Sequence, residues 1–355
     1  MKILKSILAF LTVGLFFVGC ENDTPSKSTY RPLFEAKFKS PNNNVYYNTG
    51  MPIPVQLAFD STKIESFKLW LNDSVIVNQH FGGRFFEKTV KSNDLTFGSH
   101  RLTLEAKLKD GKVVKDSRNI RVLSKTEPER WEAVVEKALP HNTTSYTQGL
   151  EFYKGELYEG TGQYGRSKLL KVLKERGVTL KEVSLEGQYF GEGITILEDK
   201  VYQLTWKAKT CFVYDVNTFE EIKRLAYPTE GWGLCNDGEH IIMSDGSHKI
   251  YFRNPETFGV EREIEVFTNR GPIGNLNELE YIDGKIYANV YTSNRIVVID
   301  PNTGNVESVI DCDLLALDHR GSGEVLNGIA YNSVSRKVYL TGKEWPELLE
   351  VSFKK

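Results

Sequence analysis

Residues able to bind a polar substrate or move a proton recur at one position of a repeated phrase. The phrase begins with Gln148, Glu192, Trp232, Asn277 and Asn327, each two residues before an apolar Leu or Ile. A carboxylate can accept or donate protons, and amide groups can form hydrogen bonds with a bound molecule. If the five copies occupy equivalent places in the fold, their first side chains meet at one point. The repeated position therefore predicts a candidate binding or active site.

Three residues of unusual type follow short predicted strands. They are Trp206 in Leu-Thr-Trp-Lys, Tyr291 in Asn-Val-Tyr-Thr and Lys343 in Thr-Gly-Lys-Glu-Trp-Pro. A carboxylate, a lysine, amides and large aromatic rings in one concavity are typical of a binding or active site. The alternative is that Gly-Leu and Gly-Ile are packing signals and that the preceding residue caps a strand. Packing does not need such varied polar and aromatic types, which favours a functional site.

The spacing of the phrase predicts the elements that position these residues. Successive copies start 44, 40, 45 and 50 residues apart, and each alternates apolar and polar residues around a turn such as Asp-Gly or Lys-Gly. A period in the forties, built from short strands and tight turns, is typical of propeller blades. Five copies predict a five-bladed β-propeller over residues 129–355. Strands over 131–137 and 348–353 are expected to pair and close the ring, which removes both free edges.

The first residues indicate export. Residues 1–19 resemble a lipoprotein signal peptide, with a basic start, an apolar run too short to span a bilayer and a glycine before Cys20. Cys20 is the predicted lipidation site, although Phe17 stands where Leu is usual; an ordinary cleaved signal with a chance cysteine is the alternative. Residues 20–29 are polar and predict a short tether. We expect an exported protein, lipid-anchored to the cell envelope, at the periplasmic face or on the surface of a Gram-negative bacterium.

Residues 30–125 predict a small immunoglobulin-like β-sandwich, so that the whole chain is expected to be all-β. Four segments alternate apolar and polar residues and are separated by turn residues: 55–59, 66–71, 100–106 and 119–123. The expected role of the sandwich is a spacer that holds the propeller away from the membrane. Binding of a cell-surface sugar or protein is the alternative.

Charge and composition exclude several function classes. The formal net charge is −2 and the basic residues are dispersed, so we expect no nucleic-acid partner. The histidines are scattered, so we expect no metal site. We also expect no cofactor and a monomeric protein. Residues 160–165 formally match a dinucleotide-binding fingerprint, but strands flank them, which predicts a glycine-rich turn and loop. Cys211, Cys235 and Cys312 are expected to be small buried apolar residues, with a Cys211–Cys235 bridge as the alternative.

Many short motifs occur in order from about residue 130 to the C-terminus. They include Tyr146-Thr-Gln-Gly-Leu, Phe190-Gly-Glu-Gly-Ile-Thr, Leu204-Thr-Trp-Lys, Glu230-Gly-Trp-Gly-Leu, Asn277-Glu-Leu-Glu-Tyr, Leu326-Asn-Gly-Ile-Ala-Tyr and Thr341-Gly-Lys-Glu-Trp-Pro. Together they resemble the glutaminyl-peptide cyclotransferases of the plant and bacterial type. The resemblance implies a five-bladed propeller, in agreement with the repeat count. It also implies that the N-terminal glutamine of a peptide or protein is converted into 5-oxoproline (pyroglutamate) with release of ammonia.

The resemblance implies a role for each residue of the site. Glu192 would carry the proton from the α-amine to the leaving nitrogen, and Asn277 and Lys343 would be catalytic beside it. The residues implied to bind substrate are Tyr146, Gln148, Phe190, Trp206, Trp232 and Tyr291. Tyr291 stands where the family usually has Trp, and Tyr146 where Phe is common. The added hydroxyls bear on substrate specificity more than on activity.

Two opposed effects govern the protonation of Glu192. Enclosure by Phe190, Trp206 and Trp232 removes water from the carboxylate and raises its pKa. Pairing with Lys343 would lower the same pKa. The sequence leaves this balance open.

Two other classes of function compete with the enzyme. The main alternative is a non-catalytic propeller lipoprotein that acts as a binding platform, but such a protein has no need to retain Glu192. A metal-dependent lactonase-type propeller needs several carboxylates around a cation, whereas only one of the five aligned inner positions is acidic. A structural cation along the central channel is a further alternative that the sequence leaves open.

Overall fold

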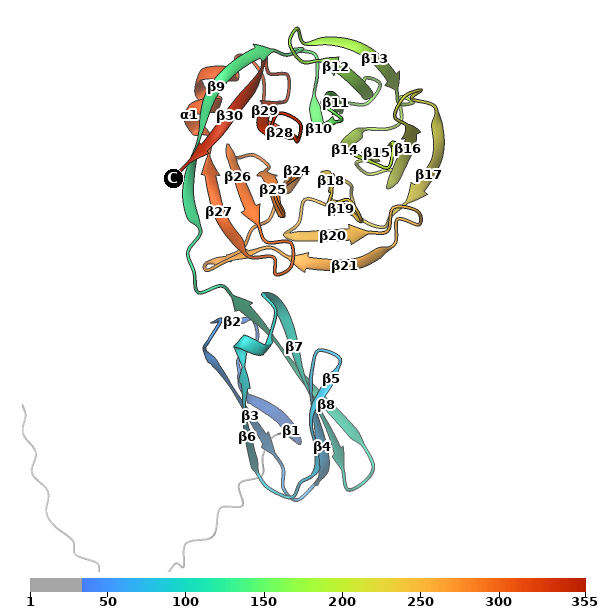
Figure 1. Cartoon of the computed structure of the whole chain (residues 1–355). Helices are drawn as coiled ribbons and strands as arrows, with labels where there is room; N and C mark the ends of the chain where they lie inside the picture. The colour runs from blue at the N-terminus through green and yellow to red at the C-terminus, as the bar shows by residue number, and fades with distance from the viewer. Residues whose placement is uncertain (1–33) are drawn as a thin grey trace, which may run out of the picture.

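The computed structural model describes residues 34–355, which form two parts made of β-strands (Figure 1). The predicted signal peptide, Cys20 and the tether lie outside the described residues. The first part consists of two packed sheets and the second is a ring of blades. Between residues 34 and 355, no helix is long and apolar enough to cross a bilayer. The predicted all-β class is confirmed.

The sandwich contains eight strands and one short helix. They are β1 (Ala36–Ser40), β2 (Val45–Asn48), β3 (Pro52–Phe59), β4 (Ile64–Leu71), β5 (Ser74–His80), β6 (Phe85–Lys91), the 3-10 helix η1 (Ser92–Asp94), β7 (Gly98–Leu108) and β8 (Val113–Leu123). One sheet has the order β1-β3-β6 and the other the order β2-β8-β7-β4-β5. Every pairing is antiparallel except that of β2 with β8.

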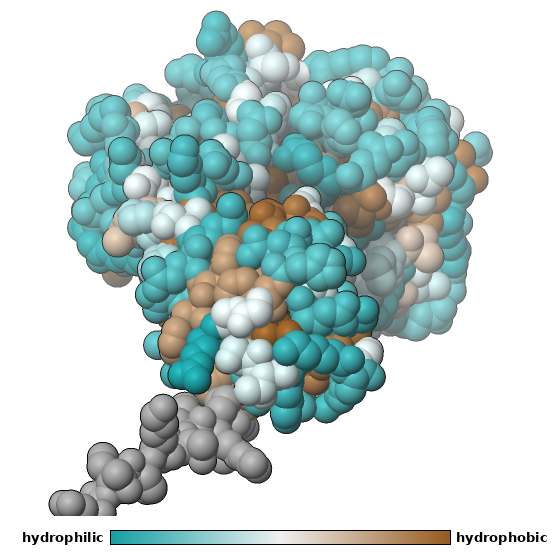
Figure 2. Space-filling model, turned by 90° about the horizontal axis from the view of Figure 1, so that it is seen from below, coloured by the Kyte–Doolittle hydropathy of each residue, from teal (hydrophilic) through white to brown (hydrophobic). Residues whose placement is uncertain are grey.

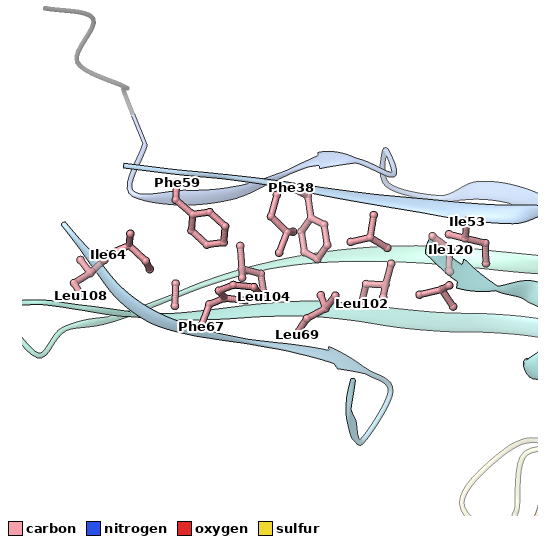
Figure 3. Close-up of a cluster of buried hydrophobic side chains, with 14 of the residues drawn as sticks. Phe38, Ile53, Phe59, Ile64, Phe67, Leu69, Leu102, Leu104, Leu108 and Ile120 are labelled. Carbon is pink, nitrogen blue, oxygen red and sulfur yellow. The ribbon is translucent and has the colours of Figure 1, made fainter. Parts of the chain in front are cut away.

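Apolar side chains from both sheets fill the space between them. Burial along β7 alternates from residue to residue, because successive side chains of a strand point to opposite faces. Figure 3 shows Phe38 and Phe59 of one sheet above Phe67, Leu69 and Leu104 of the other. Burial of these side chains is the main force that holds the two sheets together. On the face shown in Figure 2, hydrophobic residues form small groups among hydrophilic ones, as on most globular domains.

The second part has five blades. Blade 1 contains β10 (Thr147–Tyr153), β11 (Glu156–Thr161), β12 (Lys168–Leu173) and β13 (Val178–Ser184). Blade 2 contains β14 (Gly191–Leu197), β15 (Lys200–Thr205), β16 (Thr210–Asp215) and β17 (Glu221–Ala226), and blade 3 contains β18 (Leu234–Asn236), β19 (Ile241–Ser244), β20 (Lys249–Arg253) and β21 (Val260–Glu265). Blade 4 contains β24 (Leu276–Ile282), β25 (Lys285–Val290), β26 (Arg295–Ile299) and β27 (Val306–Asp311). Blade 5 contains β28 (Leu326–Asn332), β29 (Lys337–Gly342), β30 (Glu347–Lys354) and β9 (Glu129–Pro140). A hairpin of β22 (Phe267–Thr268) and β23 (Gly271–Pro272) precedes blade 4, and helix α1 (Asp313–His319) separates blades 4 and 5.

The ring is closed by β9, the strand that follows the linker from the sandwich. It pairs antiparallel with β30, the last strand of the chain, and parallel with β27 of blade 4. Blades 4 and 5 are thereby joined into one eight-stranded sheet (Figure 1). The predicted pairing of residues 131–137 with the last strand is therefore confirmed, and neither strand is left as a free edge.

Polar contacts join the sandwich to blade 3 and the linker to the hairpin before blade 4. The backbone N–H of Ser99 in β7 donates to Glu265 Oε2 over 2.6 Å, and Arg270 pairs with Glu127 of the linker at 2.7 Å. Burial raises the pKa of Glu265, but hydrogen bonds from His248 and Ser99 outweigh it and hold the pKa at about 2. The Glu265 carboxylate is thus ionised at neutral pH and fixes the start of β7 against the propeller.

In blades 1, 2 and 3 the innermost strand lies so close to that of the next blade that only glycine fits between them. A Cβ atom on Gly233 would lie inside contact distance of the Asn277 carbonyl, and one on Gly193 would overlap the backbone of Leu234. The fourth copy of the repeat has Glu278 at this position instead. Its carboxylate reaches across the channel and accepts hydrogen bonds from the backbone N–H groups of Leu150 (3.3 Å) and Ile329 (2.8 Å). The glycines therefore set the diameter of the ring, and Glu278 ties three blades together across its axis.

We expect Gly233→Ala to destabilise the propeller by about 3 kcal/mol, because the new methyl group meets backbone that cannot move aside. Gly274→Ala is the matched control, since a Cβ there meets open space. Urea unfolding followed by tryptophan fluorescence measures both changes. A Gly233→Ala protein as stable as the Gly274→Ala protein would show that the inner strands can separate without cost.

Candidate active site in the central cavity

A cavity of about 200 Å³ opens at the end of the ring where the innermost strands begin. It is lined by Tyr146, Gln148, Gln163, Phe190, Glu192, Trp206, Trp232, Asn277, Tyr291 and Lys343. All nine residues predicted from the sequence to be catalytic or to bind substrate are among these ten. The structure therefore brings the predicted residues together in one pocket.

The antiparallel hairpins of the blades explain this convergence. In blade 2, Glu192 lies near the start of β14 and Trp206 directly follows β15, so the hairpin carries both to the same end of the channel. In blade 4, Asn277 and Tyr291 are placed in the same way by β24 and β25. These blades thus each supply one residue from the start of the first strand and one from the end of the second.

The fifth repeated residue, Asn327, does not line the cavity. Its amide nitrogen donates to the Thr147 carbonyl at 3.0 Å and to Gln148 Oε1 at 3.2 Å. The expectation that all five first residues face the site is therefore wrong for this one. Asn327 instead holds the side chain of Gln148, which does line the cavity.

Glu192 is a buried acid with a raised pKa. Only 5 % of the residue is exposed, and burial raises the pKa of its carboxyl group well above the usual value. The positive charge of Lys343 opposes this shift and the negative charge of Glu230 adds to it. No ion pair within 4.0 Å of Glu192 occurs between residues 34 and 355. Desolvation therefore prevails over pairing with Lys343, which answers the question that the sequence left open.

Lys343 enters the same cavity from the end of β29. Its ammonium nitrogen lies 4.7 Å from the ring centre of Tyr146 and 5.1 Å from that of Tyr291, in positions suited to cation–π contact. Burial lowers the pKa of Lys343 to about 8, although Glu192 and Glu324 act in the opposite direction. Near neutral pH, Lys343 therefore remains mainly protonated but releases its proton more readily than a surface lysine.

The amide of Asn277 is a polar group available to a ligand. Its Oδ1 atom is buried without a hydrogen-bond partner in the part of the chain that the structure describes. An amide oxygen accepts hydrogen bonds, so only a ligand group with an N–H or O–H could pair with it, whereas the amide nitrogen of Asn277 can donate to a ligand oxygen. The cavity thus offers a carboxyl group, an ammonium group and a carboxamide to one bound molecule.

Aromatic rings form the walls of the cavity. Phe190 meets Trp206 edge to face with ring centres 5.6 Å apart, and Trp232 meets Tyr291 in the same manner at 5.5 Å. The hydroxyl of Tyr146 donates to Glu324 at 2.9 Å, so the polar end of this ring is directed to a carboxylate at the rim. Edge-to-face contacts restrict the movement of these four rings, so the walls of the cavity keep their orientation.

Sequence reasoning missed Gln163, Glu230 and Glu324. Gln163 belongs to the glycine-rich segment 160–165, interpreted only as a turn and loop, and its backbone has a φ of 89°. Glu230 accepts hydrogen bonds from the indole N–H groups of Trp206 and Trp232, which lie on different blades. Only the place of Glu230 in the motif before Trp232 pointed to it, and nothing in the sequence assigned it a partner.

Metal-ligating residues do not gather in the described part of the chain. Over residues 34–355, no three His, Cys, Asp or Glu side chains lie close enough together to hold a metal ion. Cys211, Cys235 and Cys312 are free and buried, as favoured from the sequence. Burial raises the pKa of each thiol, so they are unreactive packing residues.

Fold and cavity together define a five-bladed propeller with an acid–base pocket at one end of its channel. Residues 109–353 match the family described as glutamine cyclotransferase, and the chain belongs to that family. It is 37 % identical over 223 residues to a glutaminyl-peptide cyclotransferase of Arabidopsis thaliana, covering 61 % of this chain and 69 % of that protein. The crystal structure of Myxococcus xanthus glutaminyl cyclase matches with a TM-score of 0.61 and 34 % identity, over 64 % of this chain and 99 % of that one. The family inferred from the motifs is therefore confirmed.

The buried acid should make the fold sensitive to pH. Because the pKa of Glu192 is raised in the folded state above its reference value of 4.5, the wild type loses stability as pH rises through and above 4.5. The side chain of the Glu192→Gln variant cannot ionise and does not have this pH dependence. Its melting temperature, measured relative to that of the wild type, should therefore be higher at about pH 7 than at about pH 5. One kcal/mol corresponds to about 2–4 °C in a domain of this size.

Glu239→Gln, at an exposed position of blade 3, is the control and should follow the wild type at both pH values. Differential scanning calorimetry provides the comparison. A melting temperature difference between Glu192→Gln and the wild type that is the same at both pH values would contradict the raised pKa.

Proposed function

We propose that this chain is a glutaminyl-peptide cyclotransferase that converts the N-terminal glutamine of peptides and proteins into 5-oxoproline and releases ammonia. The observation that carries the proposal is Glu192, a buried acid of raised pKa that faces a cavity also lined by the carboxamide of Asn277 and the ammonium group of Lys343. Membership of the glutamine cyclotransferase family supports the same activity. A cavity of about 200 Å³ is small for a binding site and suits one side chain with its terminal amine.

The reaction is an internal transfer in which the substrate supplies its own nucleophile. The α-nitrogen of the substrate forms a bond to the side-chain carbonyl carbon, and the carbonyl oxygen takes the negative charge of a tetrahedral intermediate. The carbon–nitrogen bond of the original carboxamide then breaks. One proton leaves the α-nitrogen and one arrives at the departing nitrogen, which leaves as ammonia. The enzyme must therefore move a proton and stabilise an oxyanion.

Glu192 is suited to the proton transfer. A group serves best as both acceptor and donor when its pKa lies near the working pH, and burial moves Glu192 in that direction. In the proposed sequence, Glu192 takes the proton from the α-nitrogen and returns it to the leaving nitrogen. Its carboxyl group is then back in its starting state at the end of each turnover.

Asn277, Lys343 and Gln148 are proposed to bind the amide oxygen of the substrate. All three line the cavity, and each has a nitrogen donor at the end of its side chain. Removal of one donor to an oxyanion costs about 3 kcal/mol at the barrier. Trp206 and Trp232 form the slot that folds the glutamine side chain back toward its amine, so that much of the rate comes from orientation. Since these side chains supply every proposed step, we propose a metal-independent reaction.

The test is ammonia release from a short peptide that begins with glutamine. We expect Glu192→Gln to lower kcat by at least about 10²-fold, because a positioned acid–base group contributes about 10²–10⁴-fold. Asn277→Ala and Lys343→Ala should each lower kcat/KM by about 10²-fold. The same peptide with an acetylated N-terminus should release no ammonia, since its amine cannot attack.

A chelator should leave the wild-type rate unchanged. Mass spectrometry should show that the product peptide has lost the mass of one ammonia molecule. A folded wild-type protein that releases no ammonia would overturn the proposal and favour the non-catalytic binding platform.

We also propose that the protein is exported and anchored to the cell envelope through a lipid on Cys20. The support is the sequence alone: the apolar run, the glycine before Cys20 and the polar tether. Wild-type protein expressed in a Gram-negative host should incorporate labelled palmitate and sediment with membranes, whereas Cys20→Ser should do neither. Incorporation of label by the Cys20→Ser protein would exclude this anchor.

A further inference from the structure

One carboxylate outside the cavity joins two of its walls. Glu230 lies in the loop between β17 and β18, two residues before Trp232. Its Oε2 atom accepts a hydrogen bond from Nε1 of Trp206 at 2.8 Å and another from Nε1 of Trp232 at 3.2 Å. Trp206 belongs to the β15–β16 turn of blade 2, and Trp232 leads into the first strand of blade 3. A single oxygen atom thus fixes the relative position of indole rings carried by two blades.

We propose that Glu230 is a positioning residue for the cyclisation: it holds Trp206 and Trp232 at the separation that the folded glutamine side chain requires. This inference rests on the proposed function and extends it to a residue that does not line the cavity. Hydrogen bonds to an ionised acceptor are about twice as strong as those between neutral groups, so one carboxylate can orient both rings.

The other contacts of the two indoles explain why such a residue is needed. Trp206 packs on Phe190 of its own blade, and Lys207 Nζ lies 3.9 Å from the Trp206 ring centre. Trp232 packs on Tyr291 of blade 4 and lies against Gly246, where any larger residue would overlap the indole. These contacts fix each ring within its own surroundings but do not connect the two. Glu230 supplies the connection through the edge of each ring.

The charge of Glu230 has a second effect on the site. Its carboxylate adds to the burial of Glu192 in raising the pKa of that acid, while Lys343 acts against both. Glu192 also interacts electrostatically with the phenol groups of Tyr146 and Tyr227. A further charged group is Lys207, whose Nζ atom lies over the Trp206 ring. All of these remain in place when only Glu230 is changed. A substitution of Glu230 should therefore alter both the separation of the Trp206 and Trp232 rings and the pH dependence of the reaction.

Two substitutions separate these effects. Glu230→Gln keeps an oxygen that can accept from the indole N–H groups but removes the charge, so the limb of the kcat/KM–pH profile due to Glu192 should move to lower pH. Glu230→Ala removes the acceptor as well. Loss of a hydrogen bond to a charged group corresponds to about a tenfold effect, so KM should rise about tenfold or more. Glu239→Gln, an exposed carboxylate of the same blade, should change neither quantity.

The experiment measures ammonia release across pH for the wild type and the three variants, together with their tryptophan emission spectra and melting temperatures. We expect altered emission and raised KM in Glu230→Ala, with KM largely restored in Glu230→Gln but its pH limb displaced. An active wild type accompanied by a Glu230→Ala protein of unchanged KM and emission would overturn the inference. An inactive wild type would instead overturn the proposed function, and the emission spectra would still show whether Glu230 positions the indoles.

Discussion

The innermost strands of adjacent blades meet through their backbones, and this close approach determines most of what the propeller can do. Gly193 and Gly233 lie against main-chain atoms of the next blade, so the strands can converge on a narrow channel. One residue earlier in the chain, Glu192 near the start of β14 and Trp232 just before β18 line the cavity at the mouth of that channel. The glycine and the functional residue before it therefore act together in forming the site. The first brings the strands together, and the second uses the concavity that results.

Enclosure by this ring produces the chemistry of the pocket. Burial in the same cavity removes water from Glu192 and Lys343, which raises the pKa of the acid and lowers that of the base. The two groups thereby approach each other in proton affinity. Their distance beyond ion-pair contact leaves both open toward a ligand. An exposed pair of the same residues would be fully charged and strongly hydrated at neutral pH, and neither would exchange protons readily.

The repeat in the sequence was sufficient to predict the architecture and most of the site. Equivalent positions in a propeller share a radius and a height, so the spacing alone places Gln148, Glu192, Trp232 and Asn277 together. The spacing of a repeat does not specify where a side chain points. Asn327, for example, does not line the cavity but donates a hydrogen bond to Gln148. Nor does the spacing encode contacts between loops of different blades, which is why the two indole partners of Glu230 could not be predicted. The balance of burial and charge at Glu192 likewise required positions in space.

The closing strand carries a mechanical consequence. Because β9 directly follows the linker, a pull along the chain reaches the strand that seals the ring once the contacts of Glu265 with Ser99 and of Arg270 with Glu127 are broken. That strand is hydrogen-bonded on both sides, antiparallel to β30 and parallel to β27, so the load is applied along two ladders in shear rather than opening one bond at a time. The order of synthesis has a related effect. Since β9 is made before the other strands of the blades and β30 after them, the ring can be sealed only after β30 has been synthesised.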